Sequence, residues 1–205
     1  MRQLLSGAGR MHERGIVHRD IKPGNVLVGG QGVVKICDLG LAVSMASAPP
    51  PRGRAGTRWY MAPEMLLGRP DYDELVDAWL LGCVMAELLT GETLFPGQNA
   101  VDQLLRISSV LGGACVGFAH APLAVYFHSE RHDTARRLRE LFPEERLSRG
   151  GFEVLEGLLA CDPGERLPAA MAPPTSQLQP RRMRARPPFY LITWECISIP
   201  PMYDR

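Results

Sequence analysis

The sequence predicts a mainly α-helical fold with one small β-hairpin, and three observations support this. Two runs rich in β-branched residues, 26–28 and 33–36, flank a glycine-dense turn, which is the pattern of a hairpin. Residues 78–86 are apolar apart from one glycine, as in a helix that is buried all round. Asn99 is expected to cap a helix whose apolar residues Val101, Leu104, Leu105 and Leu111 share one face, and apolar residues recur at helical spacing again in 152–159. These patterns indicate one helical core that follows the hairpin in the sequence.

Composition limits the classes of protein and compartment. The 205 residues, 45% of them hydrophobic, provide material for one core, and a net charge of +1 gives no overall attraction to nucleic acid or an anionic membrane. The apolar run in the middle is too short to span a bilayer, and the N-terminus lacks a signal-peptide pattern. The five cysteines contain no C-x-x-C, and Cys37, Cys83 and Cys161 fall in core segments, which favours reduced thiols. We therefore expect a protein of the cytoplasm, the nucleus or both.

Residues 18–25, HRDIKPGN, carry the strongest functional signal. They match the catalytic-loop pattern of protein kinases, H-R-D-[LI]-x-x-x-N, with lysine where the serine/threonine kinases place it. Phosphoryl transfer needs a carboxylate to orient and deprotonate a hydroxyl, a cation on the moving phosphoryl group and a metal ligand. Asp20, Lys22 and Asn25 could supply these in turn. The alternative is a polar turn formed by chance, which Pro-Gly-Asn alone would suit.

Further segments follow in the order of that family. Residues 37–40, CDLG, resemble the D-F-G segment with Leu39 in place of phenylalanine, so that Asp38 is the expected principal Mg²⁺ ligand. Residues 56–64, GTRWYMAPE, resemble the segment that closes the activation loop. The resemblance implies that Thr57 bonds to the catalytic loop.

Two structural roles follow from the resemblance. Asp77, at the start of the apolar helix, is expected to hold the backbone of the catalytic loop, with a plain helix N-cap as the alternative. Arg166, in the segment DPGER, is the expected buried partner of Glu64, with a generic surface arginine as the alternative.

The details resemble the cyclin-dependent kinases within the eukaryotic protein kinases. The segments that carry this likeness are LFPG at 94–97, DQLLRI at 102–107 and GLA at 40–42, and AGTRWY at 55–60 is most similar to the plant F-type group. The resemblance extends from about residue 4 to about residue 170. It implies transfer of the ATP γ-phosphoryl group to serine or threonine of a protein substrate, with ATP and Mg²⁺ bound and a cyclin as one expected partner.

The part of the family pattern that precedes the catalytic loop is not found. A kinase also needs a glycine-rich loop, a strand lysine and a helix glutamate, but only seventeen residues precede His18. We therefore expect residues 1–170 to form a protein-kinase-like large (C-terminal) lobe that lacks the small lobe, which is then a second expected partner. Such a chain would be weak or inactive alone. The alternative is a non-catalytic, pseudokinase-like fragment that acts as a protein-binding module or decoy.

The activation loop departs from the family at two positions. Arg52 stands five residues before Thr57, where related kinases carry a phosphorylatable threonine, so that Arg19 has no obvious anion to meet. Met61 stands where they have an arginine that helps to select proline after the target residue. Proline-directed specificity is therefore not expected from the resemblance alone.

The C-terminal segment departs more strongly. In related kinases an amphipathic helix covers the large lobe at this point. Residues 171–205 instead contain prolines, an arginine cluster at 180–188 and a β-prone run at 189–199. We expect a divergent, disordered tail, in which the arginine cluster is a solvated linker. A nuclear-localisation or nucleic-acid patch is the alternative for that cluster.

Overall fold

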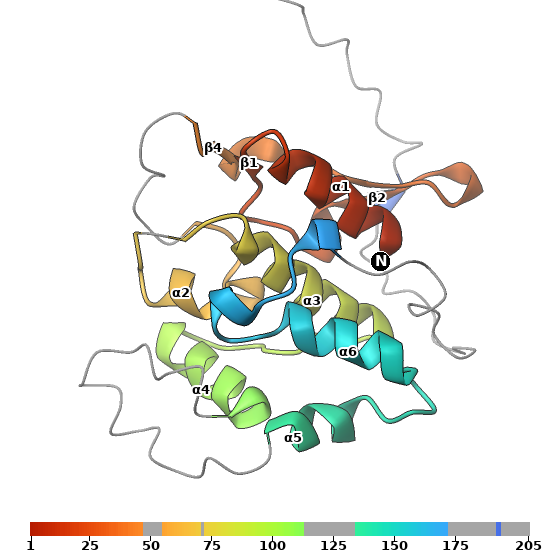
Figure 1. Cartoon of the computed structure of the whole chain (residues 1–205), viewed down its shortest axis with the longest axis vertical. Coiled ribbons are helices and arrows are strands. Elements are labelled where there is room, and N and C mark those ends of the chain that lie inside the picture. The colour runs from red at the N-terminus through yellow and green to blue at the C-terminus, as the bar shows by residue number, and fades with distance from the viewer. Residues whose placement is uncertain (47–54, 71, 113–133, 172–191, 194–205) are drawn as a thin grey trace, which may run out of the picture.

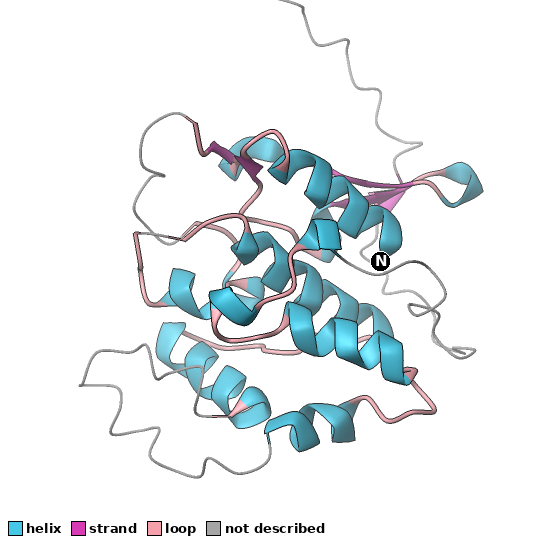
Figure 2. Cartoon of the chain, in the orientation of Figure 1, coloured by secondary structure: helices cyan, strands magenta, loops and turns pink. Residues whose placement is uncertain are grey.

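The computed structural model describes residues 1–46, 55–70, 72–112, 134–171 and 192–193. These residues are mostly helical, with two small sheets near one end (Figure 2). The prediction of a mainly α-helical fold with a β-hairpin is therefore confirmed.

The described residues form six α-helices. They are α1 (Arg2–His12), α2 (Pro63–Leu66), α3 (Leu75–Thr90), α4 (Ala100–Leu111), α5 (Thr134–Leu141) and α6 (Arg149–Leu158). Helix α3 runs through the centre, with α1 on one side and α4 and α5 at the opposite end (Figure 1). Short 3-10 helices connect these elements, at Pro23–Asn25, Gly30–Gly32, Leu39–Leu41, Arg58–Tyr60, Pro163–Glu165 and Ala169–Met171.

The five described strands form two sheets. Strands β1 (Ile16–Val17) and β4 (Val43–Ser44) pair antiparallel. Strands β2 (Val26–Val28) and β3 (Val34–Ile36) form the predicted hairpin, which is one residue shorter at its second strand than expected. Strand β5 (Ile192–Thr193) lies parallel to β2 on its other edge.

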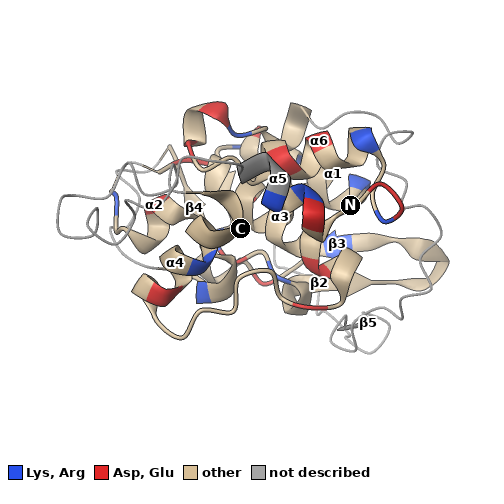
Figure 3. Ribbon diagram, turned by 90° about the horizontal axis from the view of Figure 1, so that it is seen from below, with Lys and Arg blue, Asp and Glu red and all other residues tan. Residues whose placement is uncertain are grey.

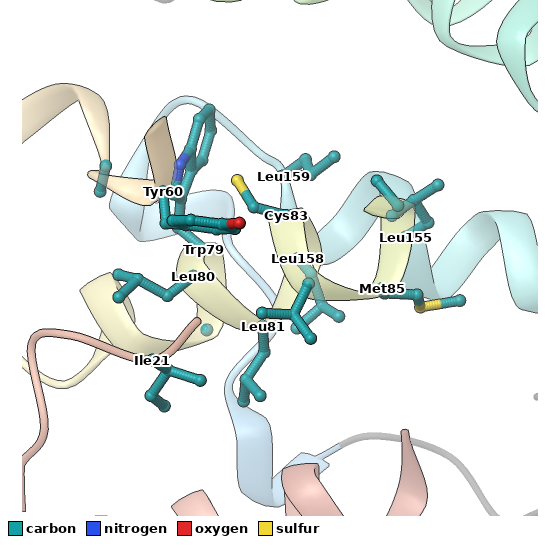
Figure 4. Close-up of a cluster of buried hydrophobic side chains, with 14 of the residues drawn as sticks. Ile21, Tyr60, Trp79, Leu80, Leu81, Cys83, Met85, Leu155, Leu158 and Leu159 are labelled. Carbon is teal, nitrogen blue, oxygen red and sulfur yellow. The ribbon is translucent and has the colours of Figure 1, made fainter. Parts of the chain in front are cut away.

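Helix α3 is the centre of the core. Thirteen of its 16 residues are buried, as the continuous apolar run predicts (Figure 4). A Cβ added at Gly82 would lie 2.8 Å from Leu159 Cδ2 and 3.1 Å from Leu158 Cβ, so the glycine favours the close approach of the end of α6 to α3. The ring of Trp79 stacks on Phe95 with 6.0 Å between centroids. The core therefore joins α3 to the segments before α4 and after α6.

The apolar stripes on α4 and α6 have different outcomes. Phe152, Leu155, Leu158 and Leu159 are all buried, as their helical spacing predicts. Asn99 caps α4, as predicted, because its side chain accepts from two backbone amides of the first turn. However, α4 buries Leu104 and leaves Val101 43% exposed. The prediction of one apolar face that includes Val101 is therefore wrong, since the helix turns another face to the core.

An ion pair joins segments that lie 102 residues apart. Arg166 donates to both carboxylate oxygens of Glu64, at 2.6 and 3.1 Å, and both residues are buried. Arg166 also donates to the carbonyl oxygens of Leu75, at 3.0 Å, and Ala160, at 2.9 Å. The guanidinium lies 5.2 Å from the ring centroid of Trp79. The alternative of a generic surface arginine is wrong.

The cysteines have more than one state. Cys37 and Cys83 are free thiols. Cys161 is disulfide-bonded, so the expectation of reduced thiols is wrong at this position. Burial raises the pKa of the Cys37 thiol, with a further increase from the charge of Asp38.

Two further expectations concern membranes and the tail. Among the described residues, no helix combines the length and the apolar character needed to cross a bilayer.

In the tail, the structure describes Met171 and strand β5, which pairs with Leu27 and Val28 of β2. The rest of the predicted tail, including its arginine cluster at 180–188, lies outside the described residues.

We predict that Arg166→Ala lowers the free energy of unfolding by about 3–5 kcal/mol, because it strands the buried Glu64 carboxylate. Denaturant unfolding followed by circular dichroism measures this change. The control is Arg149→Ala, whose pair with Glu153 lies on the surface, with side chains 86% and 60% exposed. Equal midpoints for Arg166→Ala and Arg149→Ala would contradict a stabilising role for the buried pair.

Candidate active site

The carboxylate of Asp77 holds the start of the 18–25 loop. It accepts from the backbone N–H of His18 at 2.7 Å and from that of Arg19 at 2.8 Å. The His12 ring donates to it from α1 at 3.0 Å. Asp77 is fully buried, and the N-cap of α3 is Glu74. The alternative of a plain helix N-cap is therefore wrong, and the loop backbone bonds to a buried charge as the resemblance implies.

Arg19 adopts an unusual backbone conformation and has neutral partners. Its φ is 69°, in the left-handed region that non-glycine residues rarely adopt. Its buried side chain donates to the Leu41 carbonyl at 2.7 Å and to the Tyr72 hydroxyl at 3.0 Å. These contacts use neutral acceptors where the family would offer a phosphate. Arg52, the residue in the usual phosphorylation position, lies outside the described residues.

Asp20 is the centre of a closed hydrogen-bond network. Its Oδ1 accepts from the backbone N–H and the hydroxyl of Thr57, both at 2.8 Å. Its Oδ2 accepts from Lys22 Nζ at 2.7 Å and from Asn25 Nδ2 at 3.3 Å. Lys22 Nζ also donates to Thr57 Oγ1 at 2.8 Å. Thr57 of the activation segment thus bonds to the catalytic loop, as the resemblance implies.

The network keeps the Asp20 carboxylate charged. Burial alone would raise its pKa, but hydrogen bonds from Lys22 and Thr57, together with the charge of Lys22, outweigh burial and lower the pKa of Asp20. Asp20 is 6% exposed. It is therefore an ionised and oriented acceptor at neutral pH.

Gly56 is required for the contact between Thr57 and Asp20. Its φ is +104°, and an added Cβ would lie 2.4 Å from the Arg19 carbonyl oxygen. Gly56 therefore passes directly over the backbone of the catalytic loop at Arg19. Sequence reasoning assigned Gly56 no separate role, although a glycine directly before Thr57 was the available signal.

The β2–β3 hairpin brings the backbone of Asn25 next to that of Cys37, the residue before Asp38. Asn25 directly precedes β2, and the Cys37 N–H donates to the Asn25 carbonyl at 3.0 Å, one residue before Asp38. His18 adds a second link to the same strand end. The Asp20 N–H donates to His18 Nδ1 at 3.3 Å, so the proton is on Nε2, which donates to the Cys37 carbonyl at 3.0 Å. This role of His18 was not predicted.

The donor atoms of Asn25 and Asp38 fit a hard cation such as Mg²⁺. The Asn25 amide nitrogen donates to the Asp20 carbonyl at 2.9 Å, which leaves the amide oxygen as the atom that it can present to a cation. Asp38 is exposed, has φ 66° and accepts from the Gly40 N–H through Oδ1 at 3.2 Å. Oxygen ligands of this kind, few in number and completed by phosphates and water, suit Mg²⁺.

A second anchor fixes the activation segment beyond Thr57. The Tyr60 hydroxyl donates to the buried carboxylate of Glu87 at 2.7 Å, and burial, followed by this bond, raises the pKa of the Tyr60 phenol. Gln103 of α4 donates to the Trp59 carbonyl at 3.1 Å and accepts from the Gly97 N–H at 2.8 Å. Sequence reasoning missed both anchors, because a single glutamate or glutamine in a helix gives no local signal.

Comparisons with known proteins agree with this fold and site. A model of the protein kinase domain matches residues 1–175. The chain therefore belongs to the protein kinase family.

Its relatives include plant cyclin-dependent kinases. The chain is 51% identical over 177 residues to a cyclin-dependent kinase F-2 of Oryza sativa subsp. japonica, covering 84% of this chain and 54% of that protein. It is 41% identical over 179 residues to the cyclin-dependent kinase G1 of Arabidopsis thaliana, covering 82% of this chain and 29% of that protein. The chain thus resembles a cyclin-dependent kinase. It spans about half of the length of the first relative and less than a third of the length of the second.

We predict that Gly56→Ala loosens the activation segment, because its Cβ would collide with the Arg19 carbonyl and push Thr57 away from Asp20. Trypsin should then cleave after Arg58 about tenfold faster than in the parent. The control is Gly32→Ala, which also has a positive φ, +75°, but opens on free space. An equal cleavage rate for the parent and Gly56→Ala would contradict the close approach.

Proposed function

We propose that the chain carries the catalytic centre of a serine/threonine protein kinase of the cyclin-dependent type. Its reaction would transfer the γ-phosphoryl group of ATP to a hydroxyl of a protein substrate. The observation that carries the proposal is the buried, charged Asp20, held by Thr57, Lys22 and Asn25 within a loop of kinase sequence. The family membership and the plant relatives support the same reaction.

Asp20 would act as the base. Its lowered pKa makes it a ready hydrogen-bond acceptor for the substrate hydroxyl, from which it would receive the proton during transfer. Thr57 fixes one carboxylate oxygen through two bonds, so the base has a defined orientation. Lys22, whose side chain is 29% exposed, would place its charge on the transferred phosphoryl group beside the attacking hydroxyl.

Asn25 and Asp38 would hold Mg²⁺ through oxygen atoms. When bound, this ion supplies positive charge to the phosphates and neutralises the charge that develops on them. The protein's contribution is geometric: the β2–β3 hairpin fixes the start of one ligand segment against the end of the other through the Cys37–Asn25 backbone bond. Loss of either side chain should therefore affect nucleotide binding more than proton transfer.

We also propose that these 205 residues bind Mg-ATP weakly by themselves. A kinase holds the phosphates with a glycine-rich loop and a strand lysine, and neither motif occurs in this sequence. Leu39, beside Asp38, is 56% exposed, which is consistent with a surface that a small lobe covers. The partners we propose are a protein substrate, a small lobe and, from the names of the relatives, a cyclin.

The test joins a small lobe from a related kinase to the N-terminal side of Met1. We predict that the 205-residue chain alone binds Mg-ATP no tighter than roughly 1 mM by calorimetry, and that the fusion phosphorylates a protein substrate. In the fusion, Asp20→Asn should lower kcat much more than it weakens ATP binding, whereas Asp38→Asn should weaken Mg-dependent ATP binding. A loss of kcat in one variant and a loss of ATP binding in the other would distinguish the base from the metal ligand.

Three results would contradict this proposal. Micromolar binding of Mg-ATP by the chain alone would show that the nucleotide site needs no further lobe. A folded fusion without activity would favour the alternative of a non-catalytic, protein-binding lobe. Activity that survives Asp20→Asn would show that Asp20 is not the base.

A further inference from the structure

We propose that a groove between α1 and β3 is a docking site for an acidic, extended segment of a partner protein. The groove has a volume of about 610 Å³ and is lined by one face of α1 and by β3. None of the candidate catalytic residues is among the described residues that line it. The inference is therefore independent of the proposed phosphoryl transfer and concerns a separate surface.

The two walls of the groove are tied together by the fold. The Gln3 side chain of α1 donates to the Gly32 carbonyl at 2.8 Å and accepts from the Val34 N–H at 2.9 Å. Gly7 lies opposite β3, and a Cβ added there would meet Ile36 Cδ1 at 3.7 Å, an ordinary contact distance. The groove is therefore a fixed feature of the packing of α1 on the hairpin, with room above Gly7.

The rim of the groove is positively charged. Arg2 and Arg10 are exposed on one side, and exposed Lys35 lies on β3. No aspartate or glutamate is among the described lining residues. Figure 3 shows basic ribbon segments near the labels of β3 and of the N-terminus, with acidic segments of other elements also nearby. Because the whole chain has a net charge of only +1, this is a local concentration of positive charge.

The proposal depends most on Arg10. Arg2 and Lys35 also make interactions within the protein, which a bound carboxylate would have to share. Arg10 lies in the last turn of α1. It is therefore the residue whose substitution tests the charge of the rim most directly.

The floor of the groove favours a peptide over a nucleic acid. Half-buried Met11, Val34 and Ile36 present apolar surface between the cations. A phosphate backbone would pair with the cations and leave this surface uncovered. A peptide can place carboxylates on the rim and an apolar side chain on the floor.

The spacing of the cations predicts the sequence of the ligand. Arg2 and Arg10 are eight residues apart, which is about 12 Å along a helix. An extended peptide covers this distance in about four residues, and its side chains at every second position share one face. The expected ligand is therefore acid-x-apolar-x-acid, with the apolar residue between the two carboxylates.

The test measures fluorescence anisotropy of a labelled peptide that contains Glu-Ser-Leu-Ser-Glu, mixed with the 205-residue chain. We expect a Kd of about 10–300 µM, typical of a short docking peptide, and about tenfold weaker binding for Arg10→Glu. Gly7→Met fills the floor without changing charge and should weaken binding by about fivefold; its fold should persist because methionine is a better helix former than glycine. Arg149→Glu on α6 is the control for charge reversal and should bind as the parent does.

Several outcomes would overturn the proposal. They are no binding, unchanged binding in Arg10→Glu, and equal binding of Glu-Ser-Ser-Ser-Glu, which would show that the apolar floor plays no part. Displacement of the peptide by an equally charged oligonucleotide with higher affinity would identify a nucleic-acid surface. If Gly7→Met melts at a lower temperature than the parent, Gly7→Gln replaces it, and unchanged binding there would likewise refute the groove.

Discussion

The buried carboxylate of Asp77 is the interaction on which the arrangement of the site depends. A charge with no exposed surface needs strong hydrogen bonds, and Asp77 accepts them from His12 and from the backbone of His18 and Arg19. These donors come from α1 and from the catalytic loop, whereas the acceptor belongs to the central helix α3. One side chain therefore fixes the loop, in its unusual left-handed turn at Arg19, to the most deeply buried element of the fold.

The rest of the site follows from that attachment. With the loop backbone fixed, Asp20 lies where Thr57 and Lys22 can bond to it, and Gly56 can cross above the Arg19 carbonyl. The activation segment is then held at both the loop and the core. The geometry of the base is thus a consequence of packing in α3 and not only of the local sequence around Asp20.

The sequence predicts the parts of this site that lie close together in the chain. The HRDIKPGN loop and the hairpin next to it are local patterns, so their residues could be named from spacing. His12 and Glu87 could not, because their partners are 65 and 27 residues away and one buried polar side chain leaves no periodic signal. The exposed Val101 was misassigned because α4 turns to bury Gln103, a polar residue that bonds to the activation segment.

Amide hydrogen exchange in Asp77→Asn tests the central role of this carboxylate most directly. The amide group offers one acceptor oxygen and a donor nitrogen that would face another donor, so at least one of the His18 and Arg19 amides should exchange about tenfold faster than in the parent. Amides in the middle of α3, such as that of Leu81, should keep their protection. Unchanged exchange at His18 and Arg19 would contradict the account, and so would an equal loss of protection in α3.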